Sequence, residues 1–222
     1  MTDGTQSRIP PPPGEEEIPL HQRIYDVRTY RIDGSTIRLR GRVTDTKPAG
    51  LYVADDPEPL DVHDMIVDLV IGYPTLVIEH AEAVFETHPH SSCPGIETAY
   101  EALVGVSIAR GFSRRVTELF GGVSGCTHVG ALLKAMAPVA VQSMYSMSLA
   151  DPDAPARWRD REPSDDLKER AMAFTIDSCH VWAEDGPWVS AVRAGEATEA
   201  PVWIQNRLAK LGRLDEREQW MD

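Results

Sequence analysis

The hydrophobic period of this chain changes once, and that change limits the folds open to it. In residues 24–43, 64–71 and 76–86, apolar and β-branched residues alternate with polar ones, as in strands with one buried face. After Cys93 the apolar residues recur every three to four positions, which is typical of one side of a helix. We therefore expect a sheet from the first half of the chain and a helical layer from the second half.

Two β-hairpins are predicted in the first half. Asp33-Gly34 interrupts the first alternating stretch and is a strong two-residue turn signal. Residues 45–60 are rich in Pro, Gly and Asp and are predicted to form a loop. Residues 64–71 and 76–86 alternate again on either side of a Pro-containing turn and make the second hairpin. The predicted sheet is therefore antiparallel.

Three helices are predicted to follow. Pro94 suits the first turn of a helix, where its missing N–H would have no partner, and this helix should end before Gly105. A second short helix is predicted from an N-cap at Ser113 to Gly121. Thr127 is the predicted start of the longest helix. The apolar side of this helix carries Val129, Leu132, Leu133, Met136, Ala140 and Met144.

Composition and length indicate how the chain is organised into three parts. Residues 1–22 contain four consecutive prolines and three consecutive glutamates and are predicted to be a disordered lead-in. Residues 23–192 are predicted to form a single α+β domain, because 222 residues can bury one good core. Within this domain a further amphipathic helix is predicted over residues 164–174. Residues 193–222 are expected to be a charged tail with a short helix.

Charge and cysteine content exclude several classes of function. The formal net charge of -13 argues against nucleic acid as a partner, since binding to phosphates needs clustered Lys and Arg. No apolar run approaches the roughly 20 residues that span a bilayer, and no secretory signal is evident, so we expect a cytoplasmic protein without a membrane partner. Three cysteines are an odd number, which favours reduced thiols over a disulfide framework. A small molecule or a metal-delivery protein is the partner that we expect.

Two cysteines precede predicted helices. Cys93 stands directly before Pro94, and Cys126 follows Gly125 directly before Thr127. A helix N-terminus presents unpaired N–H groups and a partial positive charge, so a thiol there ionises more easily. Cys93 could equally be a buried apolar residue, as free cysteines often are.

His128 strengthens the case for Cys126. A cysteine and a histidine two residues apart around a helix start can ligate one metal ion, or can pair as thiolate and imidazolium. His63 begins the third predicted strand, and Cys179 could supply a third sulfur. Nucleotide-binding glycine motifs, His-Glu-x-x-His and Cys-x-x-Cys are absent from the sequence.

These residues support two main hypotheses. The first is a zinc or iron site with ligands drawn from His63, Cys93, Cys126, His128 and Cys179. The second is an enzyme acting on a small acyl or aromatic compound, with Cys126 as nucleophile and His128 as its base, or with a catalytic metal ion. A third reading makes the protein a non-catalytic subunit whose cysteines belong only to the core.

Several motifs give the chain a resemblance to a known family. The motifs are Asp45-Thr46-Lys47-Pro48, His63-Asp64-Met65, Cys93-Pro94, Gly125-Cys126-Thr127-His128 and Asp177-x-Cys179-His180. The chain resembles the bacterial domain-of-unknown-function family 2889 (DUF2889) over residues 28–189. The Gly-Cys-Thr-His segment is the most specific part of the resemblance, which implies no particular activity.

The predicted architecture is also similar to that of iron–sulfur scaffold proteins of the IscU and NifU type. In both, a hairpin leads to a cysteine, and a second cysteine opens a long helix. This resemblance implies that Cys93 and Cys126 match the second and third scaffold cysteines, whereas the first has only His63 or Asp61 nearby. A mixed Cys and His set would suit zinc or mononuclear iron rather than cluster assembly.

Overall fold

The computed structural model describes residues 18–109, 111–150, 175–196 and 199–220. The chain divides into two units, Met1–Ser143 and Met144–Asp222, and each is described by itself. Residues 1–17 of the predicted lead-in and the predicted helix over residues 164–174 lie outside the described residues.

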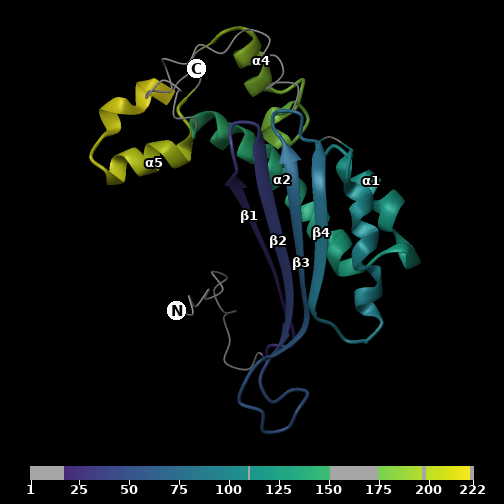
Figure 1. The fold of residues 1–222 in the computed structure, drawn as a ribbon. Helices are drawn as coiled ribbons and strands as arrows, with labels where there is room; N and C mark the ends of the chain where they lie inside the picture. The colour runs from purple at the N-terminus through teal and green to yellow at the C-terminus, as the bar shows by residue number, and fades with distance from the viewer. Residues whose placement is uncertain (1–17, 110, 151–174, 197–198, 221–222) are drawn as a thin grey trace. The chain divides into compact units, whose positions relative to one another are not determined.

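The first unit is built on a four-stranded antiparallel sheet (Figure 1). Its strands are β1 (Gln22–Arg31), β2 (Thr36–Lys47), β3 (Leu60–Gly72) and β4 (Ile78–Thr87), and they pair in sequence order. The first hairpin turns at Asp33, whose carboxylate accepts a hydrogen bond from the N–H of Ser35 at 2.8 Å. The prediction of an α+β fold with an antiparallel sheet of two hairpins is confirmed.

The predicted loop over residues 45–60 was wrong at its start, because β2 continues to Lys47. Asp45 pairs with Arg23 of β1 on one side and with His63 of β3 on the other. The ion pair with Arg23 compensates the buried charge of Asp45, so a polar residue can continue the strand. The strand ends only before Pro48, which has no N–H to give to a ladder.

The helices of the first unit differ in two details from the prediction. The segment that begins at Cys93 is a 3-10 helix, η1 (Cys93–Leu103). The carboxylate of Glu97 ties it to β4 by accepting the N–H of Phe85 at 2.7 Å. Helix α1 (Phe112–Phe120) is capped by Gly111, not Ser113. Gly111 has a φ of 89°, which glycine adopts readily, and this lets Phe112 enter the core.

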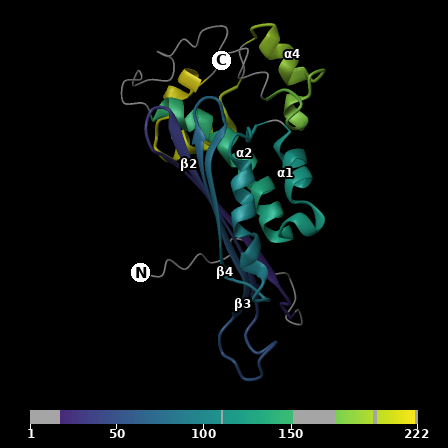
Figure 2. The same cartoon turned by 45° about the vertical axis from the view of Figure 1, so that its right-hand side comes forward.

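The short 3-10 helix η2 (Gly122–Ser124) leads into α2 (Thr127–Leu149), the longest helix in the described residues. Figures 1 and 2 show α1 and α2 on the same side of the sheet. The predicted apolar side of α2 is confirmed for its residues in the first unit. Val129, Leu132, Leu133, Met136 and Ala140 are all buried.

Helix α2 lies directly against β2 at Gly41. A Cβ atom on Gly41 would lie only 2.6 Å from Sδ of Met136. Farther along, the hydroxyl of Ser143 donates a hydrogen bond to that of Thr29 on β1 at 2.7 Å. The close approach at Gly41 fixes the distance of α2 from the sheet, and thereby the height of its first turn above β2 and β3.

The second unit contains η4 (His180–Trp182), α4 (Pro187–Arg193), α5 (Val202–Lys210) and η5 (Leu214–Trp220) among its described residues. The rings of Trp182 and Trp188 meet edge to face, with centroids 6.3 Å apart. Across the described residues of both units, none of the helices has the length and apolar character needed to cross a membrane.

Candidate functional site

Polar side chains from three elements gather where the first turn of α2 faces the sheet. β2 supplies Asp45, β3 supplies His63 directly opposite in the strand register, and α2 supplies His128. These three residues offer ligand atoms that all lie within 4.8 Å of one another. A site thus forms at the end of the sheet, beside Cys126, which directly precedes the long helix.

Asp45 is the buried anion of this site. Its side chain is 1% exposed, and Arg23 donates to both carboxylate oxygens, from Nε at 2.6 Å and from Nη2 at 2.7 Å. Burial raises the pKa of the carboxyl, but the hydrogen bonds and charge of Arg23, with the charges of His128 and His21, outweigh burial and lower the pKa to about 2. Asp45 is therefore ionised at neutral pH.

Two imidazoles contact the same oxygen of Asp45. Nδ1 of His63 and Nε2 of His128 each lie 3.1 Å from Oδ2. The rings stack on one another with centroids 3.8 Å apart. Burial, followed by the charges of His63 and Arg23, lowers the pKa of His128 against the opposing effect of Asp45. At neutral pH, His128 is thus a neutral imidazole with one available lone pair.

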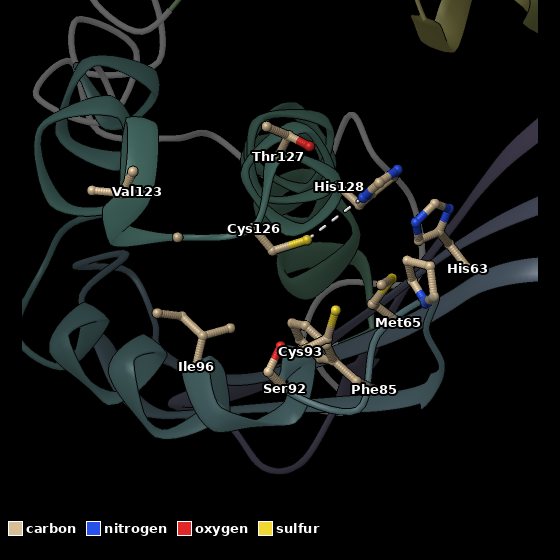
Figure 3. A pocket seen from close by; sticks show the side chains of 12 residues that line it. His63, Met65, Phe85, Ser92, Cys93, Ile96, Val123, Cys126, Thr127 and His128 are labelled. Carbon is tan, nitrogen blue, oxygen red and sulfur yellow. Dashed lines mark hydrogen bonds between the residues drawn. The ribbon is translucent and has the colours of Figure 1, made fainter.

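Cys126 lies next to this imidazole. Its Sγ is 3.6 Å from Nδ1 of His128 (Figure 3). Its backbone N–H donates to the hydroxyl of Tyr100 at 2.8 Å, and its carbonyl accepts the N–H of Gly130 at 2.9 Å. Tyr100 is fully buried, and burial raises the pKa of its phenol to about 12, so the hydroxyl stays neutral. These bonds fix the thiol at the start of α2.

A cavity of about 380 Å³ adjoins these groups. Its apolar wall includes Met65, Phe85 and Ile96, and its polar residues include the two histidines and two cysteines of the site. Figure 3 shows the sulfur atoms of Cys93 and Cys126 pointing into this pocket. The pocket is therefore lined by four of the predicted site residues. These are His63, Cys93, Cys126 and His128.

One predicted site residue lies outside the first unit, and one residue of the site was not predicted. Cys179 is exposed at the start of η4 in the second unit, which is described separately, so its membership of the site stays a prediction. Asp45 was missed because it was assigned to a loop. In the observed register Arg31 pairs with Ile37, which places Arg23 opposite Asp45, an ion pair across two strands. A two-residue turn at Asp33-Gly34 would have placed Arg23 opposite Thr44, so the predicted turn did not indicate this pair.

The arrangement can support two kinds of chemistry. Imidazole nitrogens and thiol sulfurs around one pocket are the donors that zinc and iron take in proteins. The thiol of Cys126 lies beside the imidazole of His128, which in turn contacts the carboxylate of Asp45. A cysteine nucleophile, its general base and the group that orients the base are arranged in the same order.

Comparison with known proteins gives one match. The family described as "Protein of unknown function (DUF2889)" matches residues 21–142, a range that includes all the residues around the pocket. No curated protein and no solved structure matches the chain, so its likeness to the IscU and NifU scaffolds stays a prediction. The chain belongs to the family DUF2889, whose members are proteins of unknown function.

Proposed function

We propose that this protein binds one transition-metal ion, zinc or iron, in the pocket at the start of α2. The observation that supports the proposal is the cluster of Asp45, His63 and His128, whose ligand atoms lie within 4.8 Å of one another. The thiols of Cys93 and Cys126 line the same pocket. Mixed imidazole and thiolate sets are typical of zinc and also suit iron.

The protonation state of His128 suits a metal ligand. Asp45 is a buried carboxylate, and the lowered pKa of His128 leaves that imidazole neutral and able to donate a lone pair to a metal ion. The described cysteines are free thiols, which suits a reducing compartment such as the cytoplasm. A metal-delivery protein or a small molecule that reaches the pocket is the partner that we propose.

Elemental analysis tests this function. The full chain, purified without oxygen and without chelators, is expected to contain about one zinc or iron ion. His63→Ala, His128→Ala and Cys126→Ser should each lower that content. His80→Ala is the matched control, because His80 is an exposed histidine on β4 and should leave the metal content unchanged. Wild-type protein without metal would contradict the proposal.

A second candidate function is a cysteine-dependent reaction on a small acyl or aromatic compound. The supporting observation is the series of contacts from Sγ of Cys126 to Nδ1 of His128 at 3.6 Å, and from Nε2 of His128 to Asp45 at 3.1 Å. A neutral imidazole held by a carboxylate suits a general base for a thiol.

Alkylation of metal-free protein tests this candidate. Iodoacetamide should modify Cys126 faster than Cys93 near neutral pH, with mass spectrometry identifying the site, and His128→Ala should slow the reaction at Cys126 alone. Equal and slow modification of both thiols in the wild type would count against a nucleophilic role.

A further inference from the structure

The carboxylate of Asp45 is already occupied by other groups. Arg23 donates to both of its oxygens, and His63 and His128 contact Oδ2. Nε2 of His21 lies 3.4 Å from Oδ1. A carboxylate has about four lone-pair positions, so a metal ion bound to Asp45 would have to displace one of these groups. Arg23 is permanently charged and would also repel the ion.

The charge of Asp45 decides where each imidazole carries its proton. An ionised carboxylate can only accept hydrogen bonds, so the nitrogen that faces it must be the N–H nitrogen. These are Nδ1 of His63 and Nε2 of His128. In a neutral imidazole the other nitrogen then holds the lone pair. The lone pairs of Nε2 in His63 and Nδ1 in His128 are therefore the ones available to a metal ion.

These lone pairs belong to the pocket that the thiols line. Nδ1 of His128 lies 3.6 Å from Sγ of Cys126, and the ring of His63 is stacked on that of His128. The sulfur of Cys93 points into the same pocket (Figure 3). Two nitrogen and two sulfur donors thus line one pocket, with Asp45 behind the imidazoles. Among the described residues, the ligand atoms that lie within 4.8 Å of one another include no sulfur, so a bound metal ion would draw the thiols and imidazoles together.

Building on the proposed function, we infer that the ligand atoms are Nε2 of His63, Nδ1 of His128 and the Sγ atoms of Cys93 and Cys126. Asp45 is then a positioning residue that orients both imidazoles and does not bind the metal itself. Carboxylates commonly hold metal-binding histidines in this way. On binding, each thiol releases its proton to solvent and becomes a thiolate.

The local charges support the thiolates as ligands and Asp45 as a positioning residue. Two thiolates would balance a divalent ion, and Arg23 balances Asp45 in the contacts already present. If Asp45 were a ligand as well, the guanidinium would be left without its carboxylate close to a second positive charge. Two imidazoles and two thiolates also complete the four-coordinate tetrahedral shell that is usual for structural zinc.

X-ray absorption on the metal-loaded wild type tests the ligand set without any substitution. We expect two sulfur neighbours at about 2.3 Å and two lighter neighbours at about 2.0 to 2.1 Å from zinc. A shell of nitrogen and oxygen alone would overturn the inference while leaving the proposed metal site in place. A wild type that binds no metal would instead overturn the proposed function itself.

Variants test the role of Asp45. Asp45→Asn should still bind one ion, with affinity lowered about 10- to 100-fold, because the amide holds the imidazoles less well. With Co²⁺ as probe, the thiolate-to-cobalt charge-transfer absorption should persist in Asp45→Asn and weaken in Cys93→Ser and Cys126→Ser. Asp68→Asn is the control: this β3 carboxylate pairs with Arg40 at 2.9 Å, and its loss should leave affinity unchanged.

Two results would overturn this ligand set. One is loss of cobalt binding in a folded Asp45→Asn protein together with unchanged absorption in Cys126→Ser, which would make Asp45 a ligand. The other is a lighter neighbour, nitrogen or oxygen, in place of a sulfur neighbour in the wild-type X-ray absorption. Because X-ray absorption uses the wild-type protein, it tests the ligand set even where Asp45→Asn does not fold.

Discussion

Asp45→Asn in metal-free protein should reduce stability in a way that depends on pH. A pKa of about 2 in the folded protein, against 3.8 for a free aspartate, corresponds to about 2 kcal/mol of stability at pH 7. Asparagine resembles the protonated acid and forfeits this contribution. The free energy of unfolding at pH 7 should therefore be about 2 kcal/mol lower in the variant than in the wild type.

The direction of the pH dependence follows from the depressed pKa of Asp45. The contribution is fully present above the pKa of the unfolded state and is lost as pH falls through the folded pKa, so about half remains near pH 3. Arg23, His21, His63 and His128 face this carboxylate. Below pH 4 the gap should narrow.

Urea unfolding of chelator-treated wild type and Asp45→Asn at pH 7, 5, 4 and 3 measures this gap. Comparing the two proteins at each pH cancels the titrations that they share. A gap that is absent at pH 7, or that keeps its full size at pH 3, would refute the reasoning that Asp45 is a buried anion held by Arg23.

Other predictions test the packing around the site. Gly41→Ala should lower the free energy of unfolding by about 1 to 3 kcal/mol in urea, because the new Cβ meets Met136, whereas Gly34→Ala, with nothing within 4 Å, should change it by less than about 0.5 kcal/mol. A neutral Gly41→Ala would mean that α2 does not press on β2 there. Tyr100→Phe should cost about 1 to 3 kcal/mol in thermal or urea unfolding, because the N–H of Cys126 loses its acceptor, and an unchanged stability would contradict that bond.

The parts of the fold that the sequence predicted are those with local causes. The alternating period and the Asp33-Gly34 turn determine the first hairpin within one stretch of chain, and helical periodicity predicts the buried side of α2. The 3-10 form of η1 was not predicted, because its apolar spacing fits an α-helix equally well. Gly111 as a cap was missed because a serine stood nearby.

The site was predicted only in part for the same physical reason. Cys126 and His128 are neighbours in sequence, and their contact depends only on the first turn of a helix. The meeting of Asp45 with His63 depends on how β2 pairs with β3 across a long loop, and that with His128 depends on helix packing. Such contacts join distant segments and leave no local period in the sequence.

The central claim is a metal ion bound by thiolates and imidazoles at the start of α2. Calorimetric titration of Zn²⁺ into chelator-treated full-length wild type, without oxygen and in buffers of different ionisation enthalpy, tests it most directly. The account predicts saturation at one ion per chain and heats whose buffer dependence shows proton release, because each thiol that becomes a ligand loses its proton. Absence of saturable binding, or binding without proton release, would contradict it.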